Sequence, residues 1–205
     1  MLIKVCGMRD PQNIRDIEAA APDMLGLIFA PRSPRFVSQV PDYLPQAPVV
    51  RVGVFVHADL DEVARRVEEY ALGAVQLHGG ESPAYCREVR QRLPEVQIIK
   101  VISVAEAADL RAADAYAEVA DLLLFDTRCP QGGGSGQQFD WSLLEAYDGP
   151  LPFLLSGGIG PDDAPQLRQF AHPRCVGIDI NSRFETEPAL KSAPLVAQFI
   201  KTLRA

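Results

Sequence analysis

Eight short apolar segments, rich in β-branched residues, alternate with amphipathic segments along the whole chain, and few architectures accommodate this alternation. The apolar segments cover residues 2–7, 24–30, 49–56, 74–79, 97–104, 122–127, 153–158 and 175–181. They are apolar on both faces, which is typical of parallel strands that helices cover on each side. Helices are predicted between them, at residues 11–20, 60–70, 82–93, 107–117, 141–147, 161–170 and 189–203.

The spacing of the strands favours a closed barrel. The 205 residues leave about 26 for each strand–helix unit, which is close to the minimum for a strand, a turn and a helix. We therefore predict one α/β domain over residues 1–205, a (β/α)8 TIM barrel with minimal loops. An open doubly wound sheet is the alternative. The second helix is the poorest, because five prolines in residues 31–48 allow at most a short helix near 38–44.

The charge balance bears on the kind of partner that the chain can bind. There are 20 Lys and Arg residues against 27 Asp and Glu, a net charge of −7, and the basic residues form no long run. Nucleic acids and anionic membranes are bound by clustered basic residues, so neither partner is expected. A small anion is compatible with this balance, because local donors can hold it.

The cysteines and the N-terminus point to an intracellular setting. Cysteines at positions 6, 86, 129 and 175 form no CxxC motif, which is typical of reduced thiols and gives no zinc signature. The three histidines show no converging set, so no metal is expected. The first residues lack the apolar core of a signal peptide, and no apolar run approaches about 18 residues. A cytoplasmic protein is expected.

Two residues at predicted strand ends are suited to acid–base chemistry. The catalytic residues of a (β/α)8 barrel lie at the C-terminal ends of its strands, where Cys6 and Asp126 are expected. There a thiol can ionise near cations, and a carboxyl group can exchange a proton. Each residue also has a structural alternative: Cys6 as a small buried apolar residue, and Asp126 as a cap of the loop after its strand.

Glycine-rich and polar segments follow the last three strands. The loops after strands seven and eight of such barrels commonly bind phosphate through backbone N–H groups, which makes Gly157, Gly158 and residues 179–182 candidates. Two ordinary tight turns are the alternative. Residues 132–136 contain four glycines, which suits a lid, a backbone cradle or a plain flexible link.

Two further polar side chains are candidates. Arg35 lies on a proline-stiffened loop and could bind a carboxylate through two N–H groups, although a lone surface arginine is more often only solvated. His78 ends the fourth strand and could transfer a proton, with a structural hydrogen bond as the alternative.

Eight segments together carry a family resemblance, and they run in order from the first strand to beyond the eighth. They are KVCGMRD (4–10), SPRFV (33–37), VGVFV (52–56), VQLHGGE (75–81), LLFDT (123–127), GGGSGQQFDW (132–141), SGGI (156–159) and GIDINSRFE (177–185). With them the chain resembles the phosphoribosylanthranilate isomerase family of tryptophan biosynthesis. The combination of KVCG, FDT and GSGxxFDW is more specific than any single glycine motif.

The resemblance implies a cofactor-free isomerase of the aldose–ketose type. Its reaction is the Amadori rearrangement of N-(5-phosphoribosyl)anthranilate, a small phosphorylated substrate, to 1-(2-carboxyphenylamino)-1-deoxyribulose 5-phosphate. The implied general base is Cys6, and the implied general acid is Asp126. The implied substrate-binding residues are Arg35, at the anthranilate end, and Gly134, Ser135, Gly157, Gly158, Asp179, Asn181 and Ser182. A monomer is expected rather than a homodimer.

The chain also departs from the family pattern. GIDINSRFE stands where GVDVSSGVE is usual, so that Arg183 and Phe184 replace a small pair, and Arg183 could contact phosphate or point to solvent. Ser135 stands where threonine is common. Both departures leave the proposed acid and base in place.

Two other functions fit the same fold. The sugar isomerase of histidine biosynthesis, or a bifunctional enzyme, typically has two catalytic aspartates and a longer, repeated barrel, which Cys6 and the short chain disfavour. A non-catalytic phosphosugar-binding barrel would need the glycines after strands seven and eight, but not Cys6 together with Asp126.

Overall fold

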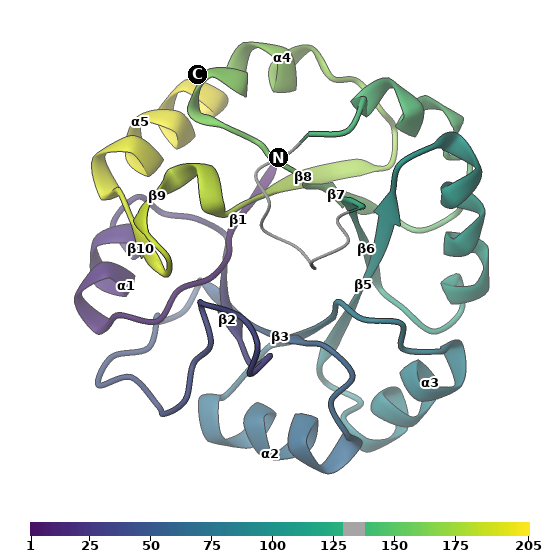
Figure 1. The fold of residues 1–205 in the computed structure, drawn as a ribbon, viewed down its shortest axis with the longest axis horizontal. Helices are drawn as coiled ribbons and strands as arrows, with labels where there is room; N and C mark the ends of the chain where they lie inside the picture. Colours follow the sequence, from purple (N-terminus) through teal and green to yellow (C-terminus); the bar gives the residue numbers. More distant parts are fainter. Residues whose placement is uncertain (129–137) are drawn as a thin grey trace.

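The eight predicted strands form a closed parallel barrel. In this computed structural model, which describes residues 1–128 and 138–205, each strand pairs with the next in chain order and β1 pairs with β8 (Figure 1). The strands are β1 (Leu2–Val5), β2 (Met24–Ile28), β3 (Val50–Phe55), β4 (Ala74–Leu77), β5 (Gln97–Val104), β6 (Leu122–Thr127), β7 (Phe153–Leu155) and β8 (Cys175–Ile180). The barrel prediction is confirmed, and the open-sheet alternative is wrong.

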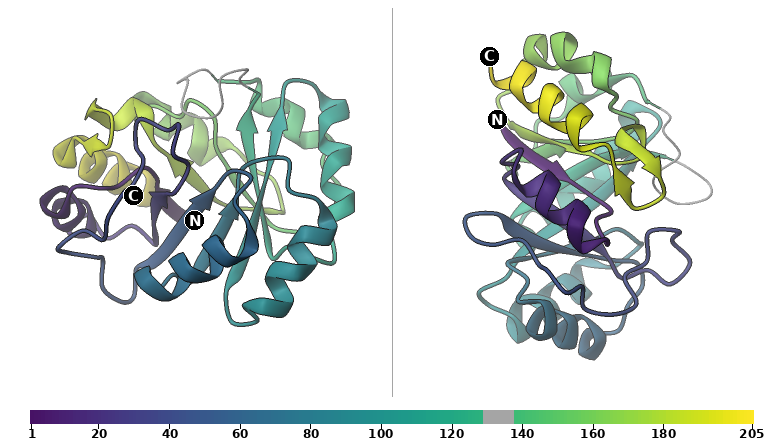
Figure 2. Two further views of the ribbon diagram at one scale, coloured as in Figure 1. Left: turned by 60° about the horizontal axis from the view of Figure 1, so that its bottom comes forward. Right: turned by 90° about the vertical axis from the view of Figure 1, so that its left-hand side faces the viewer.

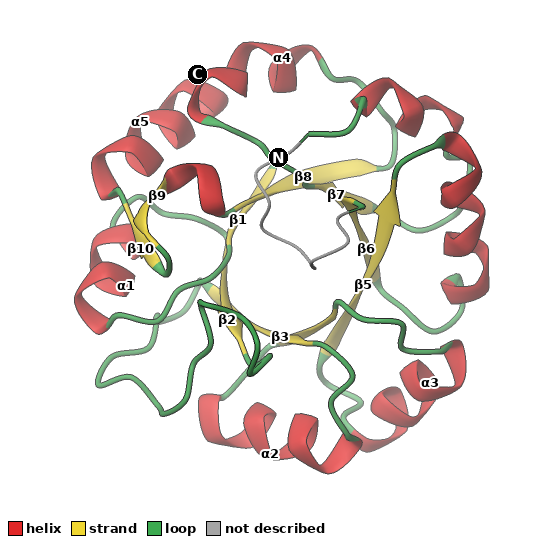
Figure 3. Cartoon of the chain, in the orientation of Figure 1, coloured by secondary structure: helices red, strands yellow, loops and turns green. Residues whose placement is uncertain are grey.

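A ring of helices surrounds the barrel (Figure 3). The α-helices are α1 (Pro11–Glu18), α2 (Leu60–Tyr70), α3 (Pro83–Arg92), α4 (Ala164–Gln169) and α5 (Ala193–Arg204). More tightly wound 3-10 helices are η1 (Ala107–Tyr116), η2 (Trp141–Ala146), η3 (Pro161–Asp163) and η4 (Ser182–Phe184). The side chains of Asp10, Asp59 and Ser82 cap the first three α-helices by accepting a backbone N–H. Within the described residues, no helix is long and apolar enough to cross a bilayer.

Two predicted helices differ from the structure. Residues 31–49 contain no helix, so the short one expected near 38–44 is absent, because the prolines remove backbone donors along this segment. The last helix begins at Ala193 and not at residue 189. Before it, β9 (Glu185–Glu187) and β10 (Leu190–Lys191) form a small antiparallel hairpin. Proline at position 194 suits only the first turn of a helix, which accounts for the late start.

The apolar core lies on both sides of the barrel wall. One cluster fills the barrel itself, with Met24, Val52, Ala74, Ile99, Val101, Leu122, Leu124 and Leu154. A larger cluster packs between the strands and the outer helices. Figure 2 shows the first and last helices, α1 and α5, side by side at the seam where β1 meets β8. Because apolar side chains fill the barrel below, polar groups near the strand ends can meet a ligand only at the mouth.

Candidate active site

A cavity of about 290 Å³ opens at the C-terminal mouth of the barrel. Its walls come from the ends of several strands and the loops after them, so residues distant in the chain meet there. The sequence candidates that line it are Cys6, Arg35, His78, Asp126, Gly157, Gly158, Asp179, Asn181 and Ser182. Gly134 and Ser135 lie outside the described residues. All candidates with a described position therefore share one cavity.

Cys6 lies directly after β1 and is only 4% exposed. Its backbone N–H donates to the carbonyl oxygen of Ile180 at 2.9 Å, which continues the pairing with β8 beyond the strand. The neighbouring strand β2 leaves space for the thiol, because a Cβ at Gly26 would lie 2.7 Å from the Cys6 sulfur. The sulfur of Cys6 thus occupies the space that a side chain at position 26 would fill.

Burial and charged neighbours together set the ionisation of Cys6. Burial has the largest effect and raises the pKa of the thiol; the positive charge of Lys4 opposes it, and the charge of Asp179 adds to it. Lys4 is buried two residues earlier on the same face of β1, and its Nζ lies 2.8 Å from Oδ1 of Asp179. The net effect raises the pKa of Cys6 above its ordinary value, so the thiol is protonated at neutral pH.

Asp126 projects from β6, which is separated from β1 by β7 and β8 in the barrel. Its Oδ1 accepts the backbone N–H of Thr127 at 2.9 Å, and its Oδ2 lies 3.4 Å from Nε2 of His78. Nδ1 of His78 lies 3.0 Å from the amide nitrogen of Gln76. Because that nitrogen donates, the neutral imidazole carries its proton on Nε2, toward Asp126. His78 therefore orients the carboxyl group, and Gln76 orients His78.

The loop after β7 presents its backbone to the cavity. Gly157 and Gly158 have φ angles of +88° and +66°, in the left-handed region that favours glycine. A Cβ at Gly157 would also lie 2.3 Å from Oγ1 of Thr127. Glycine is needed here for conformation and for space, and the resulting turn is suited to hold an anion by its N–H groups.

Two candidates on and after β8 have side chains that already bind lysines. Asp179 pairs with Lys4, and Oδ1 of Asn181 accepts a hydrogen bond from Nζ of Lys191 at 3.0 Å. A phosphate group at this position would meet backbone N–H groups and not these side-chain oxygens. Sequence reasoning missed both lysines, because no local pattern distinguishes a buried lysine from a solvated one.

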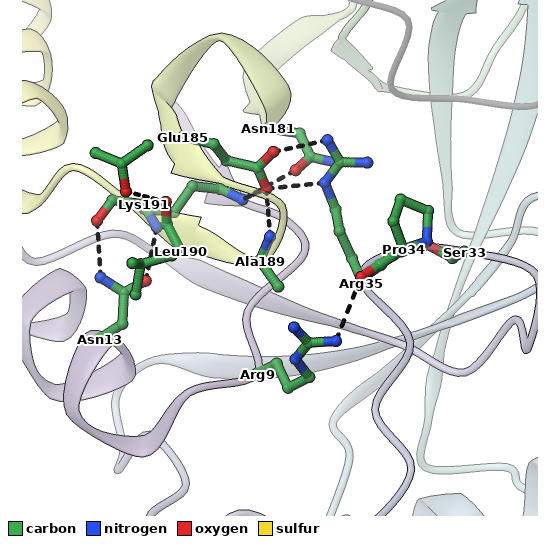
Figure 4. Close-up of polar contacts among 11 residues, drawn as sticks. Arg9, Asn13, Ser33, Pro34, Arg35, Asn181, Glu185, Ala189, Leu190 and Lys191 are labelled. Carbon is green, nitrogen blue, oxygen red and sulfur yellow. Dashed lines mark hydrogen bonds and ion pairs between the residues drawn. The ribbon is translucent and has the colours of Figure 1, made fainter.

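Arg35 reaches the cavity from the loop after β2. Glu185 of β9 holds its guanidinium through two hydrogen bonds, and Lys191 of β10 contacts the same carboxylate (Figure 4). The hairpin that carries Glu185 and Lys191 was not predicted, and so neither residue was a candidate.

The cavity therefore offers a thiol, a carboxyl group oriented by histidine, an arginine and a glycine turn. Among the described residues, no group of three or more His, Cys, Asp and Glu side chains could hold a metal ion. The groups present are suited to move protons on a small ligand that carries negative charge at both ends.

Known proteins resemble the chain over its whole length. The family model for N-(5'-phosphoribosyl)anthranilate (PRA) isomerase matches residues 3–202. The N-(5'-phosphoribosyl)anthranilate isomerase of Phocaeicola vulgatus is 48% identical over 204 residues, which cover 100% of this chain and 98% of that protein. The crystal structure of phosphoribosyl anthranilate isomerase from Thermus thermophilus has a TM-score of 0.82 at 27% identity, covering 100% of this chain and 98% of the other.

A second solved structure carries a ligand. It is phosphoribosyl anthranilate isomerase in complex with reduced 1-(o-carboxyphenylamino)-1-deoxyribulose 5-phosphate, with a TM-score of 0.81 and 28% identity. It matches 100% of this chain and 98% of its own. That ligand has a carboxylate at one end and a phosphate at the other.

Proposed function

The chain belongs to the N-(5'-phosphoribosyl)anthranilate isomerase family, and we propose that Cys6 is its general base and Asp126 its general acid. As an isomerase of tryptophan biosynthesis, it converts N-(5-phosphoribosyl)anthranilate to 1-(2-carboxyphenylamino)-1-deoxyribulose 5-phosphate. The observation that carries the residue assignment is that the thiol and the carboxyl group line one cavity from two different strands. The reaction needs one group of each kind.

The carboxyl group of Asp126 acts first. It gives its proton to the ring oxygen of the ribose as the bond between that oxygen and C1 breaks. The nitrogen lone pair of the substrate then forms a C=N bond, which leaves an iminium ion. The contact between His78 and Asp126 keeps the carboxyl group turned toward the cavity during this step.

Cys6 acts second, in the fraction of the protein whose thiol has lost its proton, because only the thiolate is basic enough for this step. The iminium ion acidifies the hydrogen on C2, and the sulfur removes it as a proton, so that the electron pair of the C–H bond forms an enolamine. Tautomerisation moves the enol proton to C1 and leaves a carbonyl group at C2. Cys6 then releases its proton to solvent and Asp126 takes one up, which restores both groups. No atom is gained or lost, which agrees with an isomerase that needs no cofactor.

The two ends of the substrate differ in their expected partners. We infer that Arg35 binds the anthranilate carboxylate, since a guanidinium can donate two parallel N–H groups to it. We infer that the phosphate binds the backbone of Gly157 and Gly158, together with that of Asn181 and Ser182. Gly134 and Ser135 stay predictions of the family pattern.

Product identification tests this function against its alternatives. The purified protein is incubated separately with N-(5-phosphoribosyl)anthranilate and with the aminoaldose substrate of histidine biosynthesis, and the products are separated by chromatography. We expect an aminoketose from the first substrate only. Conversion of both would indicate a bifunctional enzyme, and conversion of neither would favour a non-catalytic phosphosugar-binding barrel.

We propose further that the protein is a monomeric, single-domain enzyme of the cytoplasm, as expected from the sequence. Light scattering coupled to gel filtration, at protein concentrations that span those of the activity assay, tests the monomer. A mass of twice the 22.4 kDa of the chain would indicate a dimer.

Gly26→Ala tests whether the position of the sulfur matters. The new Cβ would lie 2.7 Å from Sγ of Cys6 and displace it. Because a misplacement of about 1 Å can cost on the order of a hundredfold in rate, we expect a fall of that size in kcat. Gly80→Ala is the control, since its Cβ comes no nearer than 3.4 Å to His57. An unchanged kcat in a folded Gly26→Ala protein would contradict the proposed role of the sulfur.

The pH dependence of Cys6 alkylation tests its ionisation. Only the thiolate reacts with iodoacetamide, and burial raises the pKa of Cys6 above its ordinary value. We therefore expect the alkylation rate at Cys6, followed by peptide mass spectrometry, to increase with pH and to reach its midpoint above the pKa of a free thiol. A rate that is already maximal below neutral pH would show that Lys4 outweighs burial.

A further inference from the structure

Resting on the proposed function, we propose that Glu185 is a positioning residue. It orients the guanidinium of Arg35 for the anthranilate carboxylate and thereby sets the preference for a carboxylated ligand. Figure 4 shows this arrangement, in which the side chain of Arg35 extends from its loop toward Glu185. The two residues are 150 positions apart in the chain.

Two hydrogen bonds fix the plane of the guanidinium. Nε of Arg35 donates to Oε1 of Glu185 at 2.8 Å, and Nη2 donates to Oε2 at 2.6 Å. Without these bonds the long side chain of Arg35 would sample several rotamers. Both side chains are largely buried, with 10% of Arg35 and 6% of Glu185 exposed. A bidentate pair of this kind restrains direction as well as distance.

The pair leaves donors of Arg35 for a ligand. Glu185 takes the side edge of the guanidinium, formed by Nε and Nη2. In Figure 4 the remaining terminal nitrogen points away from Glu185. Among the described residues no other side chain accepts from this guanidinium, and Arg35 lines the cavity. The Nη1–Nη2 end therefore keeps two parallel N–H groups, the number that a carboxylate can accept.

Glu185 is itself held in place. Its Oε1 also accepts from Nζ of Lys191 at 2.6 Å and from the backbone N–H of Ala189 at 3.1 Å. Burial alone would raise the pKa of Glu185, but hydrogen bonds from Arg35 and the charge and hydrogen bond of Lys191 outweigh it and hold the pKa below its ordinary value. Two cations around one carboxylate leave one positive charge in excess, which suits an anionic ligand.

The hairpin is anchored to the first helix. The side-chain amide of Asn13, on α1, donates to the carbonyl oxygen of Lys191 at 2.8 Å and accepts its N–H at 2.8 Å. This pair of hydrogen bonds fixes β10 at the seam of the barrel, and β10 fixes the lysine that contacts Glu185. The orientation of Arg35 thus depends on a series of contacts that runs from Asn13 through Lys191 to Glu185.

Arg35 also lies close to Cys6, the proposed base. A Cβ at Gly7 would lie 2.7 Å from Cδ of Arg35, and Gly7 directly follows Cys6. The backbone at Gly7 has a φ angle of +78°, which favours glycine and lets the arginine stem pass. A carboxylate on this guanidinium would be bound on the side of the cavity where the thiol lies.

The test compares two stable ligands by calorimetry. One is reduced 1-(2-carboxyphenylamino)-1-deoxyribulose 5-phosphate, and the other is its counterpart without the carboxyl group. Glu185→Gln places an amide N–H against a donor and so breaks one of the two hydrogen bonds to Arg35. We expect the preference for the carboxylated ligand to fall by about tenfold, the usual effect of losing one charge-assisted hydrogen bond. KM for the substrate should rise with it, while kcat at saturation changes little.

The direction of the change in affinity distinguishes a positioning role of Glu185 from a purely electrostatic role. Glu185→Gln makes the cluster more positive, so a purely electrostatic role predicts tighter binding of the carboxylated ligand. Positioning predicts weaker binding. Glu187→Gln, an exposed change on the same hairpin, is the matched control and should leave both affinities unchanged. An unchanged or increased preference in Glu185→Gln would overturn the proposal.

A second variant keeps the proposal testable if Glu185→Gln fails to fold. Glu185→Asp keeps the charge that Lys191 requires but withdraws the carboxylate from Arg35 by one methylene group, and it should also lose preference for the carboxylated ligand. Full preference in a folded Glu185→Asp protein would likewise overturn the proposal. Turnover by the wild-type protein is measured first. If the wild-type protein does not convert the substrate, the proposed function is wrong. If it does, and the variants keep the full preference for the carboxylated ligand, only the positioning role of Glu185 is wrong.

Discussion

Asp126→Asn is expected to lower kcat by about two to four orders of magnitude, the usual contribution of a positioned general acid. The amide has the shape of the carboxyl group and can keep the contact with His78, but it cannot deliver a proton to the ring oxygen. Affinity for the reduced product analogue should therefore change little. Steady-state kinetics give kcat, and calorimetry gives the dissociation constant.

Asp16→Asn is the matched control for this prediction. Asp16 lies on the exposed face of α1, where it accepts a hydrogen bond from Gln12, outside the cavity. The same chemical change there should leave kcat unaltered. If Asp126→Asn turned over within a few-fold of the wild-type rate, another group would have to protonate the ring oxygen, and the assignment of the acid would be wrong.

Cys6→Ala is expected to reduce kcat by about three orders of magnitude or more, because no other group at the end of β1 can take the proton from C2. Cys6→Ser restores most of the volume of the side chain, but a hydroxyl group does not ionise near neutral pH, so it should be equally inactive. Both variants should bind the reduced product analogue, since only an uncharged group of the free enzyme has changed.

A second buried thiol provides the control. Cys86 lies inside α3 and is buried like Cys6, but it does not line the cavity. Cys86→Ala should lower the midpoint of thermal unfolding slightly, through the small space it leaves, and retain the wild-type kcat. Near-normal turnover by Cys6→Ala or Cys6→Ser would remove the thiol from the mechanism.

The strands were predictable because they are short and most of their residues are apolar on both faces. That pattern has one common explanation, a parallel sheet covered by helices, and about 26 residues per unit favour a closed barrel over an open doubly wound sheet. Helices were less predictable. The segment from residue 189 has helical spacing, but Lys191 belongs to a hairpin. Its contacts are with Asn13, on α1, and with Glu185, on the other strand of the hairpin, so the helical spacing could not reveal them.

The candidate site was predictable where strand ends and family motifs coincide, as at Cys6, Asp126 and Gly157. It was not predictable where a role depends on pairing across the fold. Arg35 was predicted to bind a carboxylate of the substrate, but its pairing with Glu185, which only ended the segment GIDINSRFE, was not predicted. Their hydrogen bonds join positions 150 apart, and no local spacing reports such a contact.

The most direct test of the central claim follows the fluorescence of N-(5-phosphoribosyl)anthranilate with purified protein, without added cofactor and with a metal chelator present. We predict that the wild-type protein removes the fluorescence at a rate proportional to its concentration, and that Cys6→Ala and Asp126→Asn at the same concentration do not. A stable signal with folded wild-type protein, or decay at the wild-type rate with either variant, would contradict the claim that this cavity isomerises the substrate through these two residues.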